Sequence, residues 1–364
     1  MSDGKPPGPL RYGWTTGACA AAAAKAAYAA LLAGDFPDPV TITLPRGETP
    51  AFALAMHELG FGEASAAIVK DAGDDPDVTH GALVRATVRA GAPGSGVTFR
   101  AGEGVGTVTK PGLPLPVGEP AINPGPRGMI AAAIAEVAQA MGASDDVEVT
   151  LSIPNGEAIA RKTLNGRLGI VGGLSILGTT GIVVPFSCSA WIHSIHRGID
   201  VARAAGLTHV AGAAGSASEA AVARHFGLEE AALIDMGDFV GGMLKYIRVH
   251  PVPRVTVAGG FAKMTKLGQG LIDLHSRAGA VDFRWLAERV QELGGSEAAV
   301  HAVAQANTAV EALEIAGAAG LPLPESVARH AYDTAVKVLR GSDITLDVAI
   351  FDREGRLLAA AGRT

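Results

Sequence analysis

Residues 208–260 read THVAGAAGSASEAAVARHFGLEEAALIDMGDFVGGMLKYIRVHPVPRVTVAGG, and this stretch decides the fold of the C-terminal half. Short apolar runs (THVAGAA, AALIDMG and RVTVAGG) alternate here with longer runs of helical spacing (SEAAVARHFG and FVGGMLKYIRVH). Such alternation is typical of a parallel, doubly wound sheet. A helix over IHRGIDVARAAG precedes the stretch, helical segments follow it as far as residue 340, and a hairpin over residues 345–361 turns at Glu354-Gly355. The sequence therefore predicts an α/β, Rossmann-like C-terminal domain with a mainly parallel sheet.

The ends of the predicted strands are the places where open α/β sheets bind ligands. Glycines at these ends permit close backbone approach, and an acid at a strand end can accept the hydroxyl groups of a ribose. We therefore expect a nucleoside-bearing cofactor, although Gly turns and helix-capping acids explain the same residues. The candidates for cofactor contact are Gly212, Gly215, Asp235, Gly237, Asp238, Gly259 and Gly260. Lys263 and His275 follow the last of these strands and are either ligand contacts or plain surface charge.

The N-terminal half predicts an α+β domain. RYGWTTGACAAAAAKAAYAALL (residues 11–32) indicates a turn followed by an Ala-rich helix that Thr15 or Thr16 can cap. The runs PVTITLP, PAFALAMHEL, ASAAIVKDAG, ALVRATVRA and DVEVTLSIP predict strands of a mixed sheet, and residues 155–187 predict further strands with Gly turns. Near residues 187–194 the sequence changes from short strands with Gly turns to alternating helices and strands. We therefore expect one domain over residues 1–188 and a second over residues 189–364.

Residues 100–129 are so dense in Gly and Pro that we expect a functional loop there, with a helix starting only at residue 130. The run GEGVGTVTKPG places Gly104 and Gly106 before Lys110, where bare backbone amides could cradle a phosphate or carboxylate. Ordinary Gly turns explain the run equally well, because it is not a Walker A sequence. The loop ends on INPGPRGM, in which Asn123 and Arg127 offer planar, bidentate contacts to carboxylates.

The string KDAGDDPDVTHG gathers four carboxylates within seven residues. Its polar members are Asp71, Asp74, Asp75, Asp77, Thr79 and His80. Oxygen ligands at short spacing suit hard cations, but the pattern lacks the spacing of a calcium-binding hand, and Asp-Pro is ordinary turn chemistry. A solvated structural loop and a polar binding site therefore both remain open.

Composition excludes several classes of function. The net charge of −6 provides no basic field for a nucleic-acid backbone. Cys19 and Cys188 are far apart in the sequence, so we expect no disulfide and a protein that resides in a reducing cytoplasm. His193 and His196 have no carboxylate or Cys at metal spacing, so we expect no protein-bound metal. The Ala-rich stretch after residue 17 is interrupted and short, so we expect no membrane partner, and residues 2–9 are expected to be a loose leader.

Together these stretches resemble the CbiD family, the cobalt-precorrin-5B C(1)-methyltransferases of anaerobic cobalamin biosynthesis, over nearly the whole chain. The most specific strings are RYGWTTGACAAAAAKAA, KDAGDDPDVTHG, GEGVGTVTKPGL with GEPAINPGPR, SIPNGEAIARKTLNGRLGIVGGLSILGTTGIV, and IDMGDFVGGMLK. The resemblance implies methyl transfer from S-adenosylmethionine to C1 of cobalt-precorrin-5B, giving cobalt-precorrin-6A. The cobalt then belongs to the substrate, and the partner is a small tetrapyrrole, with a homo-oligomer as an open possibility.

On this resemblance, we expect the N-terminal loops to bind the tetrapyrrole and the C-terminal half to hold S-adenosylmethionine. The substrate-binding candidates are Thr15, Thr16, Asp74, Asp77, Lys110, Asn123, Arg127, Arg167, Lys263 and His275, with Arg161 and Lys162 as further cations for the substrate's carboxylates. Asp75 and His80 are the catalytic candidates. The transfer itself requires no strong base, because a nucleophilic ring carbon attacks a sulfonium methyl that the enzyme holds in near-attack geometry.

Two departures and two rivals accompany this hypothesis. GAAGSASE has Ala213 or Ala214 where the family commonly has a hydroxyl residue, and GGFAKMTK has Ala262 where a Gly usually precedes the Lys. A non-catalytic tetrapyrrole carrier would need only the N-terminal loops. A phosphotransferase would use the Gly104–Lys110 run and bind ATP with magnesium.

Overall fold

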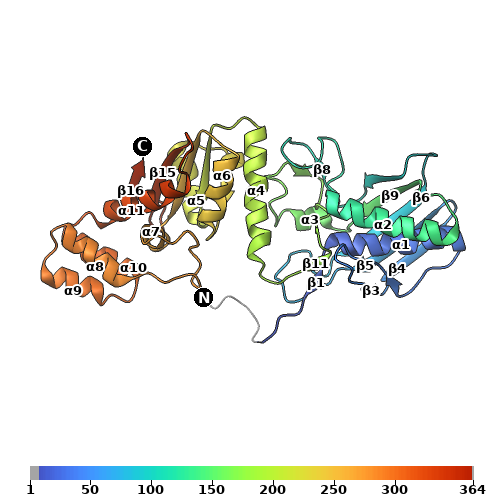
Figure 1. The fold of residues 1–364 in the computed structure, drawn as a ribbon, viewed down its shortest axis with the longest axis horizontal. Coiled ribbons are helices and arrows are strands. Elements are labelled where there is room, and N and C mark those ends of the chain that lie inside the picture. The colour runs from blue at the N-terminus through green and yellow to red at the C-terminus, as the bar shows by residue number, and fades with distance from the viewer. Residues whose placement is uncertain (1–7, 363–364) are drawn as a thin grey trace. The chain divides into compact units, whose positions relative to one another are not determined.

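The computed structural model describes residues 8–362, and most of the leader predicted for residues 2–9 lies outside them. The chain divides into two compact units, Met1–Ser187 and Cys188–Thr364. Both contain helices and strands, so the predicted mixed α/β architecture is confirmed, and Figure 1 labels the elements.

The main sheet of the first unit has the strand order β4-β5-β6-β9-β7. Its neighbours are antiparallel except for the parallel pair β7 and β9, which confirms a mixed sheet. The strands are β4 (Met56–Gly60), β5 (Glu63–Val69), β6 (Leu83–Ala90), β7 (Val97–Ala101) and β9 (Val147–Ser152). Three small pairs surround it: β1 (Gly13–Trp14) with β11 (Ile182–Val183), β2 (Val40–Thr41) with β3 (Ala51–Phe52), and β8 (Thr107–Val108) with β10 (Ile170–Val171).

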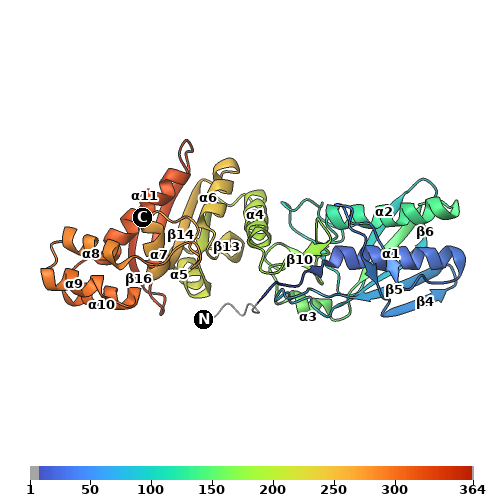
Figure 2. The ribbon, with the colours of Figure 1, turned by 60° about the horizontal axis from the view of Figure 1, so that its bottom comes forward.

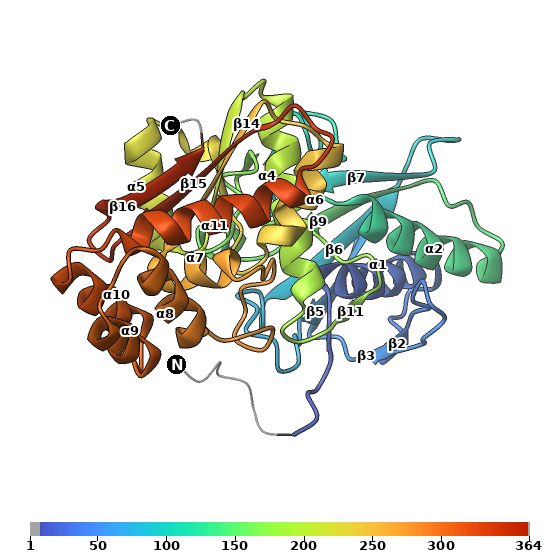
Figure 3. The ribbon, with the colours of Figure 1, turned by 60° about the vertical axis from the view of Figure 1, so that its left-hand side comes forward.

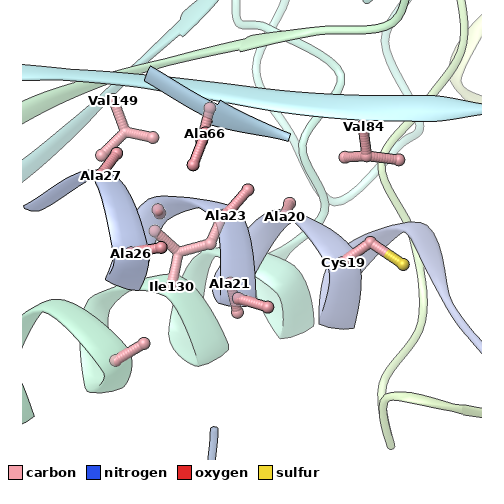
Figure 4. Close-up of a cluster of buried hydrophobic side chains, with 14 of the residues drawn as sticks. Cys19, Ala20, Ala21, Ala23, Ala26, Ala27, Ala66, Val84, Ile130 and Val149 are labelled. Atoms are coloured by element: carbon pink, nitrogen blue, oxygen red, sulfur yellow. The ribbon is translucent and has the colours of Figure 1, made fainter. Parts of the chain in front are cut away.

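The Ala-rich helix α1 (Thr16–Ala33) lies between this sheet and helix α2 (Pro124–Met141). Figure 4 shows alanines of α1 facing Ala66 and Val149 on one side and Ile130 on the other. Small side chains let both neighbours approach closely, which explains the composition. Within the described residues, α1 alone is long and apolar enough to span a membrane, but 72% of its 18-residue window is buried inside the protein.

Local signals predicted the start of α1 correctly but not that of α2. The Thr15 hydroxyl accepts a hydrogen bond from the Ala18 amide at 3.2 Å and caps α1, as predicted. Helix α2 begins at Pro124 rather than at residue 130, because proline is tolerated in the first turn, where its missing amide has no partner to lose. Residues 156–160, expected as strand and turn, form the short helix α3 (Gly156–Ala160).

The sheet of the second unit has the order β13-β12-β14-β15-β16, with parallel pairing throughout except for the antiparallel pair β15 and β16. The strands are β12 (His209–Ala213), β13 (Leu233–Asp235), β14 (Arg254–Gly260), β15 (Thr345–Phe351) and β16 (Leu357–Gly362). The predicted terminal hairpin is confirmed, with Gly355 in a left-handed conformation (φ 78°) at its turn.

Helices cover both faces of this second sheet. Helix α5 (Ser216–Phe226) packs on one face through Ala221 and Val222. The other face is covered by α4 (Cys188–Ala204), α6 (Val240–Val249), α7 (Phe261–Gly268) and α11 (Leu323–Val338), and Figure 3 shows α11 lying along the strands. Helix α4 starts seven residues before the predicted start at Ile195. Helices α8 (Phe283–Glu292), α9 (Glu297–Ala304) and α10 (Ala309–Ala318), which follow α7 and precede α11 in the sequence, form a group (Figure 2). The short helix η1 (Glu230–Ala232) precedes β13.

Candidate functional site

The carboxyl ends of β12, β13 and β14 form the most developed candidate site. From β12 the chain passes through α5 to β13 on one side, and then through α6 to β14 on the other side of β12. The direction of winding therefore reverses between β12 and β14, which is where open α/β sheets place their ligands. The Ala214 amide donates to the Ala258 carbonyl at 3.0 Å and holds these two strand ends together.

The predicted glycines at this edge fall into two groups. A Cβ on Gly212 would overlap the Met243 sulfur, and one on Gly259 would lie 2.7 Å from Met264 Cε, so both glycines serve the packing of helices on the sheet. Gly215 and Gly260 are different: they are the N-caps of α5 and α7, and both have backbone angles that any residue adopts.

The space beside these two N-cap glycines is open. Among the described residues, no heavy atom lies within 4 Å of a Cβ built on Gly215, and the nearest to one on Gly260 is the Phe351 carbonyl oxygen at 3.9 Å. Neither backbone strain nor packing requires glycine at these positions. A bare backbone here leaves room for a ligand to approach.

The predicted acids Asp235 and Asp238 also lie at this edge. Asp235 ends β13, about 20 residues after Gly215, which is the separation at which doubly wound folds place a ribose-binding acid. Asp238 forms an ion pair with Lys263, so the structure brings a predicted cofactor residue onto a predicted substrate residue. This pairing engages the Asp238 carboxylate within the protein.

A second lysine, Lys266 of α7, lies near this ion pair and contacts the loop that follows the helix. The buried Lys266 ammonium donates to the Leu274 carbonyl at 3.0 Å, and burial, with the nearby Lys263 charge, lowers the pKa of Lys266. The ring Nδ1 of His275, the remaining predicted residue here, accepts the Arg277 amide at 3.2 Å. These contacts order the loop against the ion pair.

Sequence reasoning missed one residue at the same edge, Trp191 of α4. Its indole N–H donates to the Asp235 carbonyl at 3.1 Å, and its ring lies 3.3 Å from the Cβ position of Gly237, whose φ is +51°. In the string WIHSIH only the histidines are of a metal-ligating type, and the tryptophan belongs to no catalytic motif. The signal available was a tryptophan, one of three in the chain, close to the domain boundary.

The carboxylates of KDAGDDPDVTHG have partners within the first unit, some in other segments and some in the string itself. Arg11 forms an ion pair with Asp71 through its side chain and donates its backbone amide to Asp74 at 2.6 Å. The hydrogen bond from Arg11 holds the pKa of Asp71 well below its usual range, at about 2. Asp77 pairs with the buried Lys70 at 2.7 Å. These contacts hold the loop to Arg11 and to Lys70, which directly follows β5. Within residues 8–362 no three His, Cys, Asp or Glu side chains are grouped as a metal site would require.

The two catalytic candidates have structural partners as well. Asp75 accepts the Phe186 amide at 2.8 Å, where Phe186 adopts a positive φ of 56°. The Nδ1 atom of His80 accepts the Ala72 amide at 3.1 Å, so in this arrangement the proton of a neutral His80 sits on Nε2. The Nδ1 lone pair of His80 is thus engaged by the protein in this arrangement.

The GEGVG run does not form a phosphate cradle. A Cβ on Gly104 would overlap the Ile153 carbonyl oxygen, and one on Gly106 would lie 2.9 Å from the Gly173 carbonyl oxygen. The aliphatic part of Lys110 lies against Gly169. The amides of Val105 and Gly106 donate to the carbonyls of Gly102 at 3.2 Å and Leu174 at 2.9 Å, so they are engaged within the protein, which counts against the phosphotransferase alternative.

The other predicted substrate residues of the first unit differ in their exposure to solvent and in their partners. The Arg127 guanidinium donates to Glu119 at 2.9 Å and to the Ile122 carbonyl at 2.8 Å, so its donors are used internally. Thr15 and Thr16 are buried, and the Thr16 hydroxyl donates to the Leu177 carbonyl at 3.2 Å. Asn123 is the N-cap residue of α2. Arg161 and Lys162 are exposed and Arg167 is half-buried, so these cations remain near the surface.

Comparison with known proteins shows which family the chain resembles. The family described as CbiD matches residues 3–185, and the family described as CbiD, C-terminal domain, matches residues 273–362. The cobalt-precorrin-5B C(1)-methyltransferase of a Bradyrhizobium species is 64% identical over 96% of this chain and 93% of its own length. That of Methylorubrum extorquens is 63% identical over 97% and 98%. The crystal structure of the cobalamin biosynthesis protein (cbiD) from Archaeoglobus fulgidus aligns at 27% identity over 79% of this chain and 85% of that one, with a TM-score of 0.41.

Proposed function

This chain belongs to the CbiD family and methylates C1 of cobalt-precorrin-5B in cobalamin biosynthesis, and from that premise we propose how its two units divide the work. The second unit is a Rossmann-like domain that holds S-adenosylmethionine at the carboxyl ends of β12, β13 and β14. The loops of the first unit hold the tetrapyrrole. The enzyme works in the cytoplasm on a small-molecule substrate, without nucleic acid or membrane partners.

The open space at Gly215 and Gly260 is the observation that carries the cofactor assignment. The chemistry of the site fits S-adenosylmethionine. The amino end of α5 suits the carboxylate of its methionine part, and the Asp235 carboxylate suits the hydroxyl groups of its ribose. When bound, the cofactor supplies an electrophilic methyl group on a sulfonium centre.

In this proposal the protein's own residues position the two reactants and do not activate a nucleophile. Methyl transfer needs the acceptor carbon and the methyl group aligned, and such alignment replaces a costly bimolecular encounter. This agrees with the internal engagement of Asp75 and Asp77 in the first unit. For the substrate's carboxylates we propose Arg161 and Lys162, which are exposed although Arg161 also pairs with Glu157, together with Arg167 and Lys110.

A bulky side chain at Gly215 tests the cofactor site. The Gly215→Val variant should fold normally, because the backbone is extended and the space is open, but the valine should occupy the ligand's approach. We expect at least a tenfold weaker affinity for S-adenosylhomocysteine in isothermal titration, with a Tm within a few degrees of the parent.

The matched control for that variant is Gly317→Val on the exposed surface of α10, where the described residues also leave open space. It should bind S-adenosylhomocysteine like the parent. Unchanged affinity in Gly215→Val would refute the proposed site, and binding of ATP with magnesium in place of the sulfonium ligands would refute the cofactor.

Removing the charge of Asp235 tests the ribose contact. Asp235→Asn keeps the shape of the side chain but weakens its acceptance of hydroxyl protons, so we expect a loss of about tenfold in affinity for S-adenosylhomocysteine. Asp343→Asn, an exposed acid before the amino end of β15, is the control. Equal affinities of the two variants would show that Asp235 does not contact the ligand.

A further inference from the structure

The structure fixes Trp191 at the carboxyl end of β13 on two sides. Its indole N–H is held by the Asp235 carbonyl, and one edge of the ring is covered by the backbone of Gly237. The left-handed conformation of Gly237 and the lack of a side chain there let the ring lie this close. The side chain is therefore held in one place by the protein.

Nearly half of Trp191 remains accessible, with 47% of its surface exposed. Indole is a large apolar surface to leave in water, and a ring that is both fixed and exposed is a ready platform for stacking. Its neighbour Asp235 is the acid that we assign to the ribose. Trp191 thus lies directly beside the proposed nucleoside site.

The covalent order of the cofactor determines which part would reach this ring. In S-adenosylmethionine the ribose lies between the sulfonium group and the adenine. A ligand with its methionine end at Gly215 and its ribose at Asp235 must direct its base past Asp235, away from β12. We propose that Trp191 is the stacking platform for the adenine of S-adenosylmethionine, an inference that rests on the proposed cofactor site.

Two substitutions at Trp191 separate stacking from structure. Trp191→Ala should weaken the binding of S-adenosylhomocysteine and of adenosine by about 5- to 150-fold, the range that loss of base stacking on an aromatic side chain produces. Trp191→Phe also lacks the indole N–H but keeps a ring, and it should bind within about threefold of the parent. Adenosine should quench the fluorescence of the parent and of Trp285→Phe, but not that of Trp191→Phe.

Each other outcome overturns the inference in a distinguishable way. Parent-like affinity of Trp191→Ala, with binding still lost in Gly215→Val, would leave the cofactor site standing without Trp191. An equal loss in the Phe and Ala variants would show that the hydrogen bond to Asp235 matters rather than the ring. A raised KM for the tetrapyrrole alone would mean that the ring faces the substrate. Absence of S-adenosylhomocysteine binding by the parent would refute both proposals.

Discussion

Replacing Asp77 with alanine is expected to lower the free energy of unfolding of the N-terminal unit by about 3–5 kcal/mol. The Lys70 side chain is only 2% exposed, and Asp77 accepts its hydrogen bond at 2.7 Å. Without that carboxylate the ammonium group is left charged and unpaired in an apolar interior, or must lose its proton. The change is measured by urea unfolding followed through Trp14, with Trp191 and Trp285 replaced by phenylalanine.

The controls for Asp77→Ala are Lys70→Met and the double variant. Lys70→Met should cost less, because the remaining carboxylate is 25% exposed and keeps the amide and hydroxyl of Thr79 as donors. The double variant should recover much of the loss, since no buried charge remains. If Asp77→Ala unfolds like the parent and only tetrapyrrole binding suffers, Asp77 is a ligand contact, as the sequence hypothesis proposes.

The same pair gives a pH dependence with a definite sign. Burial raises the pKa of Asp77, but the hydrogen bond and charge of Lys70 and the Thr79 donors outweigh it, so the folded pKa lies below its usual value. A lowered folded pKa contributes stability that is present above the unfolded pKa of about 3.9 and lost as pH falls through the folded pKa. Asp77→Ala should therefore lose less stability than the parent on acidification below about pH 4.

The Gly104→Ala substitution is the second large effect, with an expected loss of about 2–5 kcal/mol in the stability of the N-terminal unit. Gly104 combines a left-handed backbone (φ +69°) with backbone contact on both sides. A methyl group there would overlap the Ile153 carbonyl and lie 2.8 Å from the Gly156 nitrogen. Since these neighbours are backbone atoms, the clash cannot be relieved by rotating a side chain.

Gly142→Ala is the matched control for Gly104→Ala. Gly142 ends α2 with a similar φ of +62°, but among the described residues no heavy atom lies within 4 Å of its Cβ position. Only the backbone strain should appear there, at about 1 kcal/mol. Equal losses in the two alanine variants would mean that close packing at Gly104 contributes nothing to stability.

The sequence by itself determined the features that depend on neighbours along the chain. The alternation of apolar and helical runs predicted the strands and helices of the second unit, and Thr15 and Gly355 marked a helix start and a hairpin turn. These signals are local, since capping, turn conformation and periodicity are set by residues a few positions apart. The long ordered strings likewise indicated the family and its reaction, which the relatives' names confirm.

Only the tertiary structure decided which residues of those strings are available to a ligand. Asp75 is engaged by the Phe186 amide, 111 positions away, and Trp191 is held by Asp235, 44 positions away. No local pattern encodes such partners. The same holds for the glycines of the string GAAG. A methionine side chain occupies the space beside Gly212, whereas the space beside Gly215 is open among the described residues. A site is defined by what occupies the space around a residue, and that space is created only when distant segments pack together.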